Sequence, residues 1–189
     1  MRENKRQRLV VDPKYSAWTK KYSSKWKSCK RCPLHKETGS RVLMRGFIPF
    51  EVLLVGEAPG ESEDVLGWPF VGPSGKLLDH ILDNSVYTSY LIANTVVCTP
   101  PREDGKIRDP FQTEKETCSG HIRELISKFS PKMVIAIGLH AHRSLEWTKH
   151  IYIIRPAVLL RYPERKADIA VQQTINQISR AMKSTKQTR

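Results

Sequence analysis

The stretch EVLLVGEAPGESEDVLGWPFVGPSGKLLDHILD, residues 51–83, contains the alternation that decides the fold. It opens with the apolar run EVLLVG at 51–56, which ends in glycine and predicts a buried strand. Residues 56–75 follow with five glycines and three prolines, so we expect a long loop, and such loops inside compact domains are usually functional. Ser74 then begins the pattern SGKLLDHILD, which predicts a helix.

The rest of the chain repeats this alternation. Further strands are predicted at 90–98, 131–138 and 150–154, and helices at 14–28, 116 to about 129, 139–147 and 164–183. The first of these helices has an aromatic stripe that we interpret as core packing, at Tyr15, Trp18, Tyr22 and Trp26. The helix predicted at 164–183 is expected to face the core with Ile169, Ile175, Ile178 and Met182.

Alternating strands and helices favour an α/β fold with a parallel sheet that is covered on both sides. Ligands of such sheets bind beyond the carboxyl ends of the strands. Three unusual features fall at that end: the loop 56–75, the segment from Asn94 to Cys98, and the pair Arg155-Pro156. The polar stretch from 100 to 117 is interpreted as a loop insertion of little consequence.

Positive charge is concentrated at the two ends of the chain. The 189 residues include 32 Lys and Arg against 19 Asp and Glu, a formal net charge of +13. Twelve basic and two acidic residues lie within 1–36, and the last ten residues add four basic residues and no acid. We expect these ends to contact a nucleic-acid backbone rather than to serve only as solvated tails. The predicted organisation is a basic arm at 1–13, one domain at 14–184 and a basic tail at 185–189.

Four cysteines are spaced in a way that favours a metal site. Cys29 and Cys32 form a C-x2-C pair, and Cys98 and Cys118 follow much later in the chain. The chain shows no secretory signal, so structural disulfides are not expected. Spacing alone favours zinc and a [4Fe–4S] cluster equally, and four unrelated buried cysteines fit the C-x2-C pair poorly.

The segments GEAPGESED, GWPFVGPSGKLLD, ANTVVCTPP and RPAVLLRYP together resemble the iron–sulfur uracil-DNA glycosylases, the family four or thermophile-type branch of that superfamily. The resemblance covers about residues 25–182. It implies a three-layer α/β/α sandwich around a central four-stranded parallel sheet. It also implies that a structural [4Fe–4S] cluster is bound by Cys29, Cys32, Cys98 and Cys118.

The resemblance also implies roles for five residues of the loop system. Phe70 matches the residue that stacks on uracil, and Asn94 matches the amide that reads the pyrimidine edge. Glu57 matches the position associated with the attacking water and the cationic sugar. Glu63 matches a residue thought to exclude the methyl group of thymine, and the backbone around Ala58 is expected to donate to a base carbonyl.

Two further features complete the predicted site. Neighbouring acids of the same loop, Glu61 and Asp64, are expected to be solvated. At the start of its last motif the family expects a histidine-proline pair, and this chain has Arg155-Pro156. None of the nearby histidines occupies that position in the sequence. We assign Arg155 to stabilisation of the departing uracil anion, as a permanent cation in place of the histidine.

The predicted function is therefore a uracil-DNA glycosylase of base-excision repair, an enzyme that hydrolyses the N-glycosidic bond. The alternative is a catalytically altered or inactive member that binds uracil-containing or single-stranded DNA as a reader or replication accessory. A zinc-binding nucleic-acid module without a pyrimidine pocket would leave PFVG and GEAPG unexplained. Uracil-containing DNA, single- or double-stranded, is the expected partner of a monomeric, cytoplasmic, nucleoid-associated protein with no membrane segment.

Overall fold

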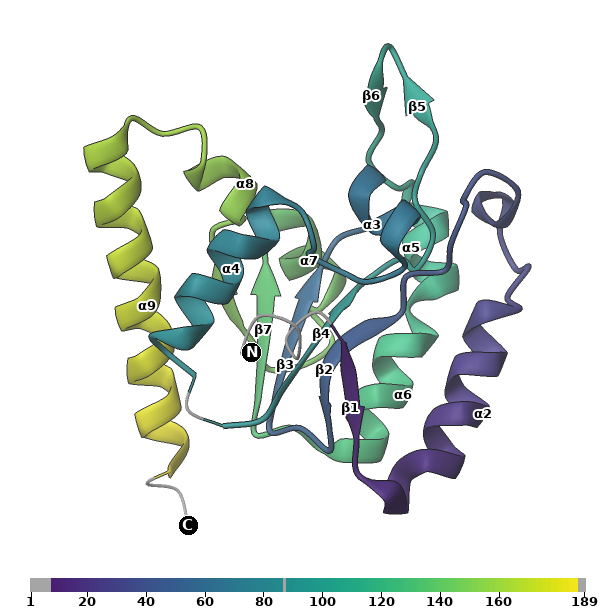
Figure 1. Cartoon of the computed structure of the whole chain (residues 1–189), viewed down its shortest axis with the longest axis horizontal. Helices are drawn as coiled ribbons and strands as arrows, with labels where there is room; N and C mark the ends of the chain where they lie inside the picture. The colour runs from purple at the N-terminus through teal and green to yellow at the C-terminus, as the bar shows by residue number, and fades with distance from the viewer. Residues whose placement is uncertain (1–7, 87, 187–189) are drawn as a thin grey trace.

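The computed structural model describes residues 8–86 and 88–186 and contains a mixed sheet between two layers of helices (Figure 1). The main sheet has the strands β1 (Leu9–Val11), β2 (Met44–Ile48), β3 (Val52–Gly56), β4 (Tyr90–Asn94), β7 (Met133–Ile137) and β8 (Ile151–Ile153). The helices are α2 (Ser16–Lys27), α3 (Glu61–Leu66), α4 (Pro73–Asp83), α5 (Gln112–Cys118), α6 (Gly120–Phe129), α7 (Leu139–Ser144), α8 (Pro156–Leu159) and α9 (Glu164–Lys186), with short 3-10 turns at Pro13–Tyr15 and Pro33–Lys36. Within these described residues, every helix lacks the length or the apolar character that crossing a lipid bilayer requires.

The strand order of the main sheet is β1-β2-β4-β3-β7-β8. The four predicted strands correspond to β4, β3, β7 and β8, which are neighbours and run parallel. The expected three-layer α/β/α architecture is confirmed, but the expectation of a four-stranded, entirely parallel sheet is wrong. Two more strands extend it, and β2 runs antiparallel to β4. The sequence of β2, MRGFI, contains an arginine and a glycine, so it shows no apolar run that would predict a strand.

The first strand comes from the segment that the sequence assigns to the basic arm. Leu9–Val11 pairs in parallel with β2, and the backbone N–H of Asp12 donates to the carbonyl of Ile48 at 2.8 Å. Residues 1–7 of the arm and residues 187–189 of the tail lie outside the described residues. The domain boundaries at 13 and 184 stay predictions.

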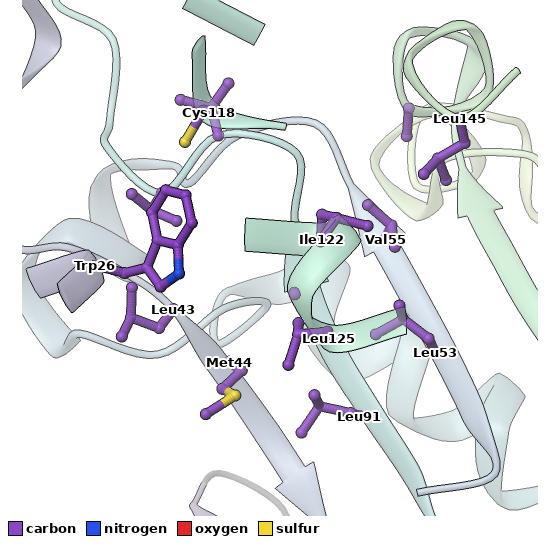
Figure 2. Close-up of a cluster of buried hydrophobic side chains, with 14 of the residues drawn as sticks. Trp26, Leu43, Met44, Leu53, Val55, Leu91, Cys118, Ile122, Leu125 and Leu145 are labelled. Carbon is purple, nitrogen blue, oxygen red and sulfur yellow. The ribbon is translucent and has the colours of Figure 1, made fainter. Parts of the chain in front are cut away.

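Helices α4 and α9 cover one face of the sheet, and α2 and α6 cover the other (Figure 1). The side chains of β3 alternate between the two faces, as the two-residue period of a strand requires. Leu53 and Val55 join the core under α2 and α6, whereas Val52 and Leu54 join the core under α4 and α9. Figure 2 shows the first of these cores, where Trp26 lies near other buried apolar side chains from the sheet and α6.

The helix surfaces largely follow the predicted patterns. Tyr22 and Trp26 of α2 are at most 1% exposed, which confirms that the aromatic stripe packs in the core. In α9, Ile175 and Ile178 are buried, but Ile169 is 52% exposed, so its predicted inward orientation is wrong. Six residues separate Ile169 from Ile175 and rotate a helix by about 600°, which places the two side chains on different faces.

The polar stretch after Cys98 forms a hairpin that the sequence analysis did not predict. Strands β5 (Arg102–Glu103) and β6 (Lys106–Ile107) pair antiparallel and project beyond the body of the molecule (Figure 1). Asp104 and Gly105 between them both have positive φ, at 50° and 75°. An Asp-Gly pair with this conformation is a strong signal for a two-residue hairpin turn.

Candidate active site

A pocket of about 100 Å³ opens at the carboxyl ends of β3, β4 and β7. It brings together all six residues that the sequence analysis assigned to base binding and catalysis. The lining residues are Glu57, Ala58, Gly60, Glu63, Phe70, Ser74, Asn94, Ile137 and Arg155. Ser74 and Ile137 were not predicted, although Ile137 ends a parallel strand and so occupies the position where such sheets bind ligands.

Asn94 is the last residue of β4 and presents an unpaired acceptor. The strand ends four residues before its predicted end, because Thr95 and Val96 donate their backbone N–H groups to the carbonyls of Gly56 and Glu57, at 2.8 and 2.9 Å. Asn94 is 2% exposed, and its Oδ1 has no hydrogen-bond partner within the described residues. An unpaired buried acceptor is unfavourable by about 1–3 kcal/mol, and a ligand that donates an N–H group would remove that penalty.

Phe70 is held in a strained backbone conformation next to Asn94. Its φ of 54° lies in the left-handed region, which large side chains rarely adopt and which recurs at binding sites. A Cβ at Gly56 would lie 2.6 Å from Cζ of the Phe70 ring and 2.4 Å from Oδ1 of Asn94. Glycine at position 56 therefore allows the ring and the amide to approach the strand end.

A buried arginine on β2 holds the loop that contains Phe70 through hydrogen bonds. Arg45 of β2 is fully buried and donates from Nε to the carbonyl of Pro69 at 2.7 Å and from Nη2 to the carbonyl of Phe70 at 3.2 Å. The same Nη2 lies 2.8 Å from Oδ1 of Asp79 on α4. Sequence reasoning missed Arg45, because its position in an unpredicted strand carries no motif.

The carboxylates of Glu63 and Asp64 on α3 accept hydrogen bonds from neighbouring loops. Oε2 of Glu63 accepts the backbone N–H of Gly60 at 3.1 Å, and Oε1 accepts that of Val71 at 3.1 Å, so this carboxylate links the GEAPG and PFVG segments. The expectation that Asp64 is solvated is wrong. Oδ1 of Asp64 accepts the hydroxyls of Thr38 and Thr99 at 2.8 and 3.1 Å. Despite partial burial, hydrogen bonds from residues 38–40 and Thr99 lower the pKa of Asp64.

Glu57 lies among three basic side chains. Its side chain is 7% exposed, and Oε1 lies 2.6 Å from Nδ1 of His140 and 3.0 Å from Nζ of Lys115. Nη1 of Arg155 lies 3.8 Å from the other carboxylate oxygen, Oε2. The sequence analysis did not predict Lys115 or His140. Lys115 lies within the segment interpreted as an insertion of little consequence, as does Asp109, whose Oδ2 lies 3.7 Å from Nδ1 of His140.

The four cysteines gather in a second, small cavity beside the pocket. Cys29 and Cys32 come from the loop after α2, Cys98 from the loop after β4, and Cys118 from the end of α5, and all four line this cavity. Each lies in the described part of the chain and is a free thiol. Burial raises the pKa of Cys98 to about 11 and that of Cys118 to about 12. Partial burial acts against it, but a hydrogen bond from Nε of Arg31 at 3.5 Å lowers the pKa of Cys29.

A buried histidine connects the pocket to the core on the α2 side. His121 is fully buried, and its Nε2–H donates to the backbone carbonyl of Asn94 at 2.6 Å. Its Nδ1 accepts the hydroxyl of Tyr22 at 3.0 Å. Burial lowers the pKa of His121 to about 4, so the ring is neutral at pH 7, as this arrangement of one donor and one acceptor requires.

This combination of fold and pocket agrees with comparison against known protein families. The family model described as the uracil DNA glycosylase superfamily matches residues 46–179, which include the whole pocket. The chain belongs to the uracil DNA glycosylase superfamily. The matched segment begins in β2 and ends in α9, so it covers both helix layers of the fold.

Several proteins named as uracil-DNA glycosylases are similar to the chain. The protein from Pyrobaculum aerophilum named "Type-4 uracil-DNA glycosylase" is 38% identical over 121 residues, which are 63% of this chain and 60% of the relative. Proteins of the same name from Sulfurisphaera tokodaii and Thermotoga maritima are 36% and 35% identical, over 66% and 63% of this chain and 54% and 61% of those relatives. The chain thus matches between about half and three fifths of the length of these superfamily members.

Proposed function

We propose that the protein is a uracil-DNA glycosylase that removes uracil from DNA in base-excision repair. The observation that carries this proposal is the pocket, where the Phe70 ring, the unpaired Oδ1 of Asn94, the Glu57 carboxylate and the Arg155 guanidinium line one space. A glycosylase extracts its nucleotide from the stack and needs these kinds of group around the base and the sugar. The names of the similar superfamily members support the same activity.

Base recognition follows from the two groups at the strand end. Phe70 offers a flat apolar surface for the uracil ring, and stacking of this kind is worth about 1–3 kcal/mol per base. Oδ1 of Asn94 accepts the N3–H of uracil while the amide nitrogen donates to O4. Glu63 excludes the 5-methyl group of thymine from the pocket, and the backbone N–H of Ala58 donates to a base carbonyl.

Cleavage separates charge, and two ionised side chains respond to it. The bond between C1′ and N1 breaks with its electron pair leaving on uracil, so positive charge develops on the sugar and negative charge on the base. Glu57 stabilises the sugar cation and orients the water, whose oxygen bonds to C1′ and whose proton passes to solvent. Arg155 donates to the uracil anion with up to two hydrogen bonds, in place of the histidine of the family.

The four cysteines are proposed to hold a [4Fe–4S] cluster with a structural role. Four thiolates are the ligand set of such a cluster. All four cysteines line one cavity and come from three separate segments, a donor set that fits a cube with one thiolate at each of its four corners. The cluster would connect the loop after α2 to the loop after β4.

DNA is the proposed partner, bound by a monomer in the cytoplasm close to the nucleoid. Exposed basic side chains without an exposed acid between them follow the outer surface of α2 and the loop after it, at Lys20, Lys21, Lys25, Lys27, Lys30 and Arg31. Such a surface suits the phosphate backbone. The basic arm and tail would add to this contact.

The test is excision of uracil from a labelled oligonucleotide, with alkali used to cleave the abasic sites that form. We expect strand cleavage that depends on uracil and on the protein, and none with thymine at the same position. If uracil-containing DNA binds tightly and stays intact, the protein is a reader and the catalytic assignment fails. Tight binding without preference for uracil would exclude the pocket as a base-recognition site.

A further inference from the structure

Glu57 holds its two carboxylate oxygens in different environments. We propose that Lys115 and His140 are positioning residues that bind Oε1 and thereby fix the orientation of the Glu57 carboxylate, with Oε2 turned to the pocket and Arg155. This inference rests on the proposed glycosylase function. It assigns a role to two side chains that no motif of the sequence marks.

The two oxygens of the Glu57 carboxylate have different partners. Oε1 has two partners, Nδ1 of His140 at 2.6 Å and Nζ of Lys115 at 3.0 Å. Oε2 is approached only by Nη1 of Arg155, at 3.8 Å, among the described residues. Because Glu57 and Arg155 line the pocket and Lys115 and His140 do not, Oε1 is held from outside the pocket and Oε2 is left for the reaction.

The two positioning residues come from elements on either side of the strand end. Lys115 lies on α5, and its side chain is 13% exposed, whereas His140 lies on α7 with a side chain that is 39% exposed. The second group near Nδ1 of His140 is Oδ2 of Asp109, at 3.7 Å. Both groups that face Nδ1 are carboxylates, so Nδ1 carries the proton and donates it to Glu57.

The arrangement matters because Glu57 is nearly excluded from water. Burial disfavours the charged form of a carboxyl group, and nearby cations restore it. Only the ionised form can stabilise positive charge on the sugar. Lys115 supplies a cation fixed to the protein, and the hydrogen bond from His140 fixes the rotation of the carboxylate.

A bound divalent cation is the competing explanation for this cluster. Glu57, Asp109 and His140 offer ligand atoms that all lie within 4.8 Å of one another. However, Nζ of Lys115 already lies 3.0 Å from the carboxylate oxygen that a cation would use, and its positive charge opposes a metal ion there. The proposal therefore predicts that excision needs no added metal.

The test compares Lys115→Met and His140→Ala with the wild type. Single-turnover excision at saturating protein should slow by about 10- to 100-fold in each variant, the scale of a misplaced reacting group. Affinity for an oligonucleotide with 2′-fluoro-2′-deoxyuridine, which resists excision, should change less than twofold.

Three comparisons separate positioning from a structural role. Lys115→Arg and His140→Asn keep a donor near Oε1 and should recover most of the rate. Lys106→Met removes an exposed lysine from β6 with the same change in charge and should leave the single-turnover rate unchanged. Asp109→Asn and a chelator should have little effect, whereas a loss of activity with EDTA that Mg²⁺ or Mn²⁺ restores would replace this proposal with a metal site.

The outcomes distinguish the positioning role of Lys115 and His140 from the glycosylase function on which it rests. If the wild type excises uracil and both Lys115→Met and His140→Ala keep its single-turnover rate, the positioning role is wrong and the glycosylase function stands. A wild type that excises nothing overturns both. Since His140 is partly exposed, His140→Ala remains informative even if Lys115→Met proves unstable in thermal unfolding.

Discussion

The pocket and the cysteine cavity lie next to each other, and the segment from Asn94 to Cys98 contributes to both. The loops and the strand end that form the pocket are held in place by hydrogen bonds that Arg45 and His121 donate and that Glu63 accepts. The cysteine cavity is lined mainly by thiols and apolar groups, and two of its cysteines lie on a partly exposed loop.

This difference shows two ways of building a site at the same edge of a sheet. The pocket is preorganised by backbone and side-chain hydrogen bonds, so its binding groups need no added component to stay in position. The cysteines lack comparable bonds to one another, so a bound metal cluster would supply the missing links. His121 connects the pocket to the core on the α2 side through Asn94 and Tyr22, and Asp64 joins α3 to the loops that contain Thr38 and Thr99.

The largest effect should come from breaking the cysteine cavity. Cys98→Ala is expected to remove the cluster and to give poorly soluble protein, because metal binding contributes to folding where it closes a long loop. Iron analysis of protein purified without oxygen should find about four iron atoms per wild-type chain and far fewer in the variant. Stoichiometric zinc without iron in the wild type would contradict this prediction.

Breaking the pocket should leave folding and iron intact and change only the reaction. Arg155→Ala is expected to lower the single-turnover rate of excision by about 10²–10³-fold, the scale of losing one donor to a developing anion. Arg155→His should retain or raise activity, since it restores the residue of the family. An inert wild type together with an active Arg155→His variant would mean that the pocket is formed but disabled by the arginine.

The buried histidine between the pocket and the α2-side core should make stability depend on pH. His121 has a pKa of about 4 in the folded protein and about 6.5 when unfolded, so the unfolded chain gains a proton first as the pH falls. Its contribution to stability is complete above pH 6.5 and is lost toward pH 4. The free energy of unfolding in urea should fall by about 2 kcal/mol between pH 7 and pH 5 from this group alone. A His121→Gln variant should show a smaller decrease, and an equal decrease would assign the effect to other groups.

The smallest effect should come from the basic arm, which lies far in sequence from both regions. Deleting residues 2–7 removes Arg2, Lys5 and Arg6 and stops before β1. The affinity for DNA should then fall less steeply with added salt, because fewer phosphate contacts release fewer counterions. Excision at saturating protein should not change. A chain with glutamine at these three positions is the matched control, and an unchanged salt dependence would assign the arm to solubility.

Much of the site was predictable because it depends on short motifs. The run at 51–56, the glycine-rich loop and the strand predicted at 90–98 place Glu57, Phe70 and Asn94 toward one edge of a parallel sheet, although that strand ends four residues earlier than predicted. The Asp104-Gly105 pair also carries enough information in the sequence to predict the β5–β6 hairpin. In contrast, β2 could not be recognised, because its arginine is buried through contacts with Pro69, Phe70 and Asp79 rather than through its own apolarity.

The sequence by itself therefore determined the α/β class, the loop system of the pocket and the set of four cysteines, since local patterns and motifs carry that information. Only the tertiary structure decided that the sheet has six strands and that α5 and α7 place Lys115 and His140 on one oxygen of Glu57. His140 and Glu57 are 83 positions apart, and their contact depends on how two helices pack at the end of a strand. Periodicity reports which face of an element is buried, but it carries no information about which distant charge lies opposite.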